Sequence, residues 1–127
     1  MAGNRIRAVY FVIQAVATLA WWLLIAVSPR WRASFAFGDD GASLRPFLAA
    51  DLVFWCAGSL AVGHGEWHGS RWTCPARLLL CGAMTCSVLH SASLATISGA
   101  GWPGVFLMLP ALVTALWLTR SASCSTS

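Results

Sequence analysis

Four apolar runs constrain this chain more than any other feature of its sequence. They cover about residues 8–27, 46–63, 77–97 and 102–118. A helix needs roughly 20 apolar residues to cross about 30 Å of hydrocarbon, and each run is close to that length. Because the runs fill most of the 127 residues, we expect an all-α fold. We predict a four-helix transmembrane bundle that forms a single transmembrane domain over residues 1–127.

Composition indicates the medium that surrounds these helices. Hydrophobic residues make up 58% of the chain and charged residues only 9%, which does not provide an ordinary water-soluble surface. The formal net charge is +4, and all eight basic residues are arginines near the ends of the apolar runs. Arginines placed in this way suit an anionic lipid surface, whereas a nucleic-acid-binding protein gathers its basic residues on one patch. We therefore predict a multi-pass protein of the lipid bilayer that binds no nucleic acid.

The arginines also predict an orientation, because four helices would place both termini and the connection at residues 64–75 on one side. That side carries five arginines, Arg5, Arg7, Arg71, Arg77 and Arg120. The other side carries three, Arg30, Arg32 and Arg45, together with Asp39 and Asp40. Positive charge concentrates on the cytoplasmic side of a membrane, so we expect both termini in the cytoplasm. A cleaved signal peptide is the alternative for the first run, but its length and Pro29 after the candidate cleavage site favour a retained helix.

One acidic residue, Asp51, falls inside an apolar run. A charged carboxylate in hydrocarbon costs at least about 2.5 kcal/mol, so such a residue normally faces protein or water. At about 1.5 Å per residue, Asp51 lies roughly 7 to 8 Å below the outer end of its helix, and His90 lies roughly 10 Å below the same face. We therefore expect the two side chains to meet, because a carboxylate beside an imidazole lowers the cost of burying both.

We predict an intramembrane polar cluster around this pair, in the outer half of the bundle. Its members are Asp51, His90, Trp21, Trp22, Trp55 and Ser91. Two interpretations of the cluster stay open. Either it takes up and releases a proton, or Asp51 bonds the backbone near a helix start while His90 bonds across a helix interface.

Other motifs favour structural interpretations. Small residues at Gly58-Ser59 and Gly82-Ala83 predict places where helices approach closely. The five cysteines include no Cys-x-x-Cys, the dithiol expected of a quinone-coupled disulfide enzyme. His64 and His68 have the spacing of zinc ligands on a helix, but the adjoining glycines favour a solvated turn. We therefore predict no metal site and no catalytic residue, and the sequence leaves any cofactor unknown.

Pro29, Arg30 and Phe35 in the outer connection, and the Asp51-Leu52 pair early in the second run, carry a family resemblance. With its four apolar runs, the chain resembles small uncharacterised bacterial four-helix membrane proteins that are broadly called DoxX-like. The resemblance covers most of the length and implies a place in the bacterial inner membrane. Some DoxX-like proteins are associated with quinone-linked sulfur oxidation or with membrane redox complexes, which implies a partner subunit. No catalytic residue is carried over, because the chain has no diagnostic motif.

Three functions are consistent with these features, and we predict the first, with the other two as alternatives. The first is a non-enzymatic accessory subunit of a membrane complex, bound to a membrane protein partner or assembled as a homo-oligomer. The second is a proton-coupled transporter of a small molecule or cation, with Asp51 as the coupling carboxylate. Small multidrug-resistance transporters resemble the chain in size, but they carry a glutamate in the first helix, where this chain has Gln14 and Thr18. The third is a subunit of a quinone-linked membrane redox system.

Overall fold

The computed structural model describes residues 2–39 and 41–121, and over these residues it contains helices but no strand. The elements in chain order are α1 (Ala2–Val27), α2 (Pro29–Phe35), α3 (Leu44–Ala50), η1 (Asp51–Gly58), α4 (Ser59–Trp67), α5 (Thr73–Ser98) and α6 (Trp102–Arg120). Four stretches of the described chain are long and apolar enough to cross a membrane: Gly3–Val27, Leu44–Trp67, Thr73–Ser98 and Trp102–Arg120. The prediction of an all-α fold with four long apolar helices is therefore confirmed.

The second and third long helices extend further than the apolar runs that predicted them. α3, η1 and α4 form one continuous rod from Leu44 to Trp67, whereas the prediction ended near Gly63. α5 begins at Thr73, so the connection between the two helices shortens to residues 68–72. Hydropathy ended the second run near Gly63 because Glu66, a charged residue that the fold buries, follows it, and it began the third run only at Arg77, four residues after α5 begins.

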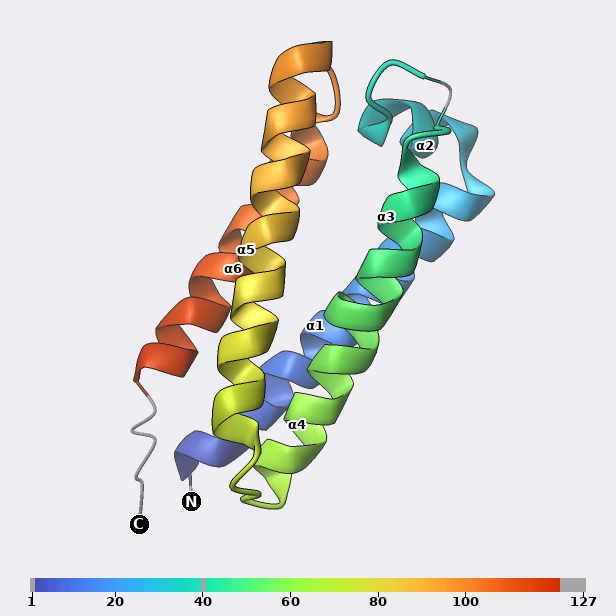
Figure 1. Cartoon of the computed structure of the whole chain (residues 1–127). Helices are drawn as coiled ribbons and strands as arrows, with labels where there is room; N and C mark the ends of the chain where they lie inside the picture. The colour runs from blue at the N-terminus through green and yellow to red at the C-terminus, as the bar shows by residue number, and fades with distance from the viewer. Residues whose placement is uncertain (1, 40, 122–127) are drawn as a thin grey trace.

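The long helices form two pairs that lie side by side (Figure 1). α1 packs along η1 and α4, and α5 packs along α6. η1 and α4 also contact α5, and these contacts join the two pairs. The start of α1, the end of α6 and the α4–α5 connection lie together, and we refer to this as the terminal end. The opposite end, where α2 lies, is the α2 end.

Two clusters of buried apolar side chains hold these elements together. The larger one has as its buried members Phe11, Trp55, Val62, Leu80, Cys81, Met84, Val88, Leu112 and Ala115. The smaller one has Ile25, Phe35, Ala36 and Leu44 at the α2 end. The ring centroids of Phe35 and Trp21 lie 4.0 Å apart, and this contact anchors α2 to α1. α2 was not predicted from the sequence, although Pro29 suits the first turn of a helix.

Glycine sets the distance between α1 and α4. A β-carbon built on Gly63 would lie 3.1 Å from Cγ2 of Val12 and 3.2 Å from the carbonyl oxygen of Ala8. The two helices approach this closely because Gly63 has no side chain. Gly58 lies similarly close to α5, but a β-carbon on Gly82 would meet nothing within 4 Å. The predicted close packing at Gly82 is therefore wrong, because that residue lies on an outward face.

We expect Gly63→Leu to destabilise the protein by about 1–3 kcal/mol, because the new side chain would force α1 and α4 apart. Gly82→Leu is the matched control, since its side chain would enter open space. The measurement is the free energy of unfolding of both variants in detergent micelles. An equal loss of stability in the two variants, or no loss in Gly63→Leu, would contradict the close contact.

Candidate functional site

A wide helical turn positions the candidate site. Residues Asp51–Gly58 form the π-helix η1, in which backbone hydrogen bonds join residues five apart. This geometry buries Asp51, Trp55 and Cys56, while Leu52 and Phe54 face outward. π-helical turns are rare and often lie at functional sites, so η1 is the first place at which to seek one.

Asp51 is the buried acid at the start of η1, with 9% of its surface exposed. Its Oδ2 accepts a hydrogen bond of 3.1 Å from the indole Nε1–H of Trp22 on α1. Its Oδ1 has no hydrogen-bond partner among the described residues. A buried carboxylate with one bare oxygen is costly in apolar surroundings, so this arrangement leaves Asp51 able to bind a proton or a ligand.

Asp51 and Trp55 line two cavities on the flanks of η1. The larger cavity, of about 600 Å³, lies between α3, η1 and α5 and includes Phe47 and His90 in its wall. We refer to it as the His90 cavity. The smaller cavity, of about 300 Å³, lies between α1, η1 and α6, and we name it the Gln14 cavity after a second residue of its wall. One acidic residue is thus shared by two spaces within the bundle.

The structure places every member of the predicted polar cluster on a cavity wall beside Asp51. Trp21, Trp22 and Ser91 line a third and much smaller cavity together with Asp51. His90 is exposed in the wall of the His90 cavity, and the centroid of its ring lies 5.4 Å from that of the Phe47 ring. Over the described residues, Asp51 and His90 share no hydrogen bond or ion pair. The indole of Trp22, and not the imidazole of His90, therefore satisfies Asp51.

Two residues of α1 add polar atoms that the predicted cluster did not include. Gln14 is 6% exposed, and its Nε2–H donates to the sulfur of Met84 at 3.5 Å, while its Oε1 has no partner within the described chain. The hydroxyl of Tyr10 donates to the carbonyl oxygen of Ala111 on α6. In the sequence, Gln14 and Tyr10 could have been noticed as polar side chains inside an apolar run. Hydropathy could not show that both residues line the cavity that α6 closes.

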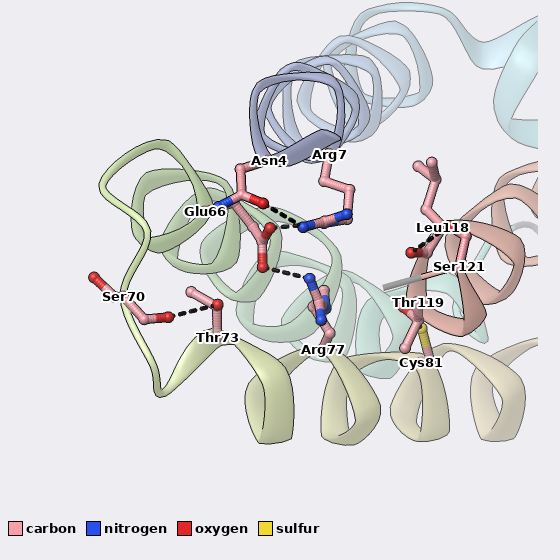
Figure 2. Close-up of polar contacts among 10 residues, drawn as sticks. All are labelled: Asn4, Arg7, Glu66, Ser70, Thr73, Arg77, Cys81, Leu118, Thr119 and Ser121. Carbon is pink, nitrogen blue, oxygen red and sulfur yellow. Dashed lines mark hydrogen bonds and ion pairs between the residues drawn. The ribbon is translucent and has the colours of Figure 1, made fainter. Parts of the chain in front are cut away.

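A second buried acid lies at the terminal end of the same helical rod. Glu66 is 2% exposed, and its two oxygens accept hydrogen bonds from Nε of Arg7 at 2.7 Å and from Nη1 of Arg77 at 2.6 Å. Figure 2 shows the Glu66 carboxylate between the two guanidinium groups. Asn4 Oδ1 accepts a further hydrogen bond from Arg7 at 2.6 Å. We call Arg7, Glu66 and Arg77 the ion cluster, and it ties α1, α4 and α5 together.

The ion cluster corrects two predictions from the sequence. Asp51 is not the only acid inside the long apolar helices, because the second of them extends through Glu66 to Trp67. The predicted solvated turn from His64 onward is wrong, because α4 continues through His64 and ends just before His68. Both imidazoles are exposed, and the described part of the chain holds no group of three or more metal-ligating side chains.

Comparison with known proteins adds no family to this description. No protein-family model, no curated protein and no solved structure matches the chain. The resemblance to DoxX-like proteins therefore stays a prediction from the sequence, and the function has to be argued from the geometry of the site.

We expect Glu66→Gln to lower the free energy of unfolding by about 3–5 kcal/mol, because it leaves two guanidinium groups together without their carboxylate. Asp39→Asn is the matched control, since Asp39 is an exposed acid whose carboxylate, among the described residues, bonds only to Ser43. Its loss should be about 1 kcal/mol or less. Unfolding of both variants in detergent micelles checks this difference, and similar losses in the two would contradict a stabilising role for the ion cluster.

Proposed function

We propose that the chain is a multi-pass membrane protein whose four long helices cross the bilayer. All four helices expose large apolar side chains, among them Val16 and Leu23 on α1, Leu60 on α4, Leu79 and Leu89 on α5, and Phe106 and Val113 on α6. Hydrocarbon solvates such surfaces, whereas a monomer in water rarely exposes apolar patches of this extent. The proposal places the protein in the bacterial inner membrane with both termini in the cytoplasm, on the side that carries more arginines.

Within the membrane, the proposed function is transport of a small molecule or cation coupled to protonation of Asp51. The observation that supports it is the position of Asp51, which lines both the His90 cavity and the Gln14 cavity and has one oxygen without a partner. A carboxylate in such surroundings binds a proton or a cation, because either one neutralises its charge. Exchange of one for the other couples the movement of the proton to that of the substrate.

The charges around Asp51 favour this exchange. The titratable side chains that share its cavities are His90 and Cys86 from α5 and Tyr10 from α1. The walls of these cavities, as far as the described residues form them, contain no arginine. Arg77 is paired with Glu66 at the other end of the rod. Asp51 therefore has no permanent counterion there, and a proton or a substrate cation can supply the positive charge.

The accessory subunit and the quinone-linked redox subunit are the alternatives. Both assign the decisive chemistry to a partner, and neither requires this chain to keep a half-bonded carboxylate between two cavities. The transport function does require such a group, so the geometry supports it best.

We expect the purified protein in liposomes to exchange external guanidinium for internal protons, which a trapped pH-sensitive dye reports as a rise in internal pH. Guanidinium is a small, permanently charged ion that is rich in N–H donors. Asp51→Asn should abolish the exchange, because an amide neither releases a proton nor balances a cation. Asp39→Asn removes a carboxylate outside the long helices and should retain the wild-type rate.

The wild-type rate in a folded Asp51→Asn variant would contradict coupled transport. Absence of exchange in the wild type, with loss of a co-purifying membrane protein from Asp51→Asn, would favour the accessory role. Bound quinone, with loss of electron transfer when this chain is removed from its complex, would favour the redox role.

A further inference from the structure

Buried polar atoms without partners are concentrated at the Gln14 cavity. Five such atoms occur among the described residues: Gln14 Oε1, Asp51 Oδ1, Trp55 Nε1, Ser59 Oγ and Arg77 Nε. The first three belong to residues that line this one cavity, and those side chains are 6%, 9% and 5% exposed. Because buried polar groups are nearly always hydrogen-bonded in folded proteins, this concentration points to a bound molecule.

The hydroxyl groups of the cavity wall and one oxygen of Asp51 are already bonded. The Tyr10 hydroxyl donates to a carbonyl oxygen of α6, and the Thr18 hydroxyl donates to the carbonyl oxygen of Gln14 at 2.9 Å. Oδ2 of Asp51 accepts from Trp22. Among the buried atoms of this wall, two oxygen acceptors and one N–H donor remain without a partner. A complementary molecule therefore carries at least two hydrogen-bond donors and one acceptor.

The cavity wall also favours a positive charge on the donor side of this molecule. Asp51 is its acidic group, and no basic side chain lines the cavity within the described chain. The aromatic side chains of Tyr10, Trp21 and Trp55 belong to the wall, and aromatic faces attract cations. The volume of about 300 Å³ has room for about ten non-hydrogen atoms if each takes roughly the 30 Å³ of a water molecule.

We infer that the Gln14 cavity binds a small primary ammonium ion that also carries an oxygen acceptor. Its N–H groups donate to Asp51 and Gln14, and its oxygen accepts from Nε1–H of Trp55. Ile13 and Leu107 line the same cavity and are 61% and 56% exposed, so they suit an alkyl chain between the polar groups. This inference names the substrate class of the proposed transport function and rests on that function for its role, but the binding is measured separately.

The experiment is calorimetric titration of the full-length protein in detergent micelles with 4-aminobutan-1-ol. Butane-1,4-diol has nearly the same shape without the charge, and butan-1-amine keeps the charge without the oxygen. We expect the amino alcohol to bind at least about tenfold more tightly than either analogue, because each analogue leaves a buried polar group unpaired.

Variants of the cavity wall identify the groups that make these bonds. Asp51→Asn and Gln14→Leu should each weaken binding of the amino alcohol about tenfold. Trp55→Phe keeps an aromatic ring but removes the N–H, so it should weaken binding of the amino alcohol and leave that of butan-1-amine unchanged. Ser59→Ala removes an unpartnered buried atom that does not line the cavity, and this matched control should keep the wild-type affinity.

Equal affinity for the amino alcohol and the diol would overturn the inference, and so would equal affinity in the wild type and all variants. Binding of the amino alcohol without Asp51-dependent guanidinium exchange would support the ligand class and contradict transport. Exchange without binding of the amino alcohol would support transport and contradict the ligand class.

Discussion

The arrangement of the helices depends on one buried carboxylate that joins three of them at the terminal end. Glu66 accepts hydrogen bonds from Arg7 on α1 and Arg77 on α5. Burial of Glu66 and Arg77, with Arg7 partly buried beside them, is costly, and the attraction among the three charges offsets that cost only while they stay in contact. One turn away, Gly63 lets α1 lie directly against α4. The terminal end is therefore held by ion pairs and by close backbone contact, whereas Asp51 lies nearer the α2 end of the same rod.

The two acids of this rod have opposite surroundings, although both are buried. They are 15 residues apart (66 − 51), which is about 22 Å along a helix. Two guanidinium groups satisfy Glu66, whereas Asp51 has only the indole N–H of Trp22. A fully paired carboxylate stabilises a fold and is not available to a ligand. A carboxylate with one oxygen unpaired destabilises the protein without a ligand and can bind a ligand or a proton. The proposed function is therefore assigned to Asp51.

The wide turn of η1 places the half-paired Asp51 beside the cavities of the bundle. It lies between the regular helices α3 and α4 and gives Asp51 and Trp55 a place in the walls of both the His90 cavity and the Gln14 cavity. The His90 cavity and the Gln14 cavity each lie between helices of different pairs. In the transport proposal, movement of one pair against the other changes which cavity Asp51 serves, as in carriers whose site lies between two helical units.

Hydropathy along the chain predicted the four helices, the all-α class and a buried acid at residue 51, because each depends on whether water or an apolar medium surrounds a local segment. It could not predict the partners of the buried polar groups. Glu66 pairs with arginines 59 and 11 residues away, and it lies beyond the last residue that hydropathy assigned to its helix. Likewise Trp22 bonds to Asp51 where His90 was expected, and Gly63 makes the close contact that was predicted at Gly82. Tertiary packing alone determined these hydrogen-bond partners and this close contact, because the rotation and spacing of each helix depend on side chains of other helices.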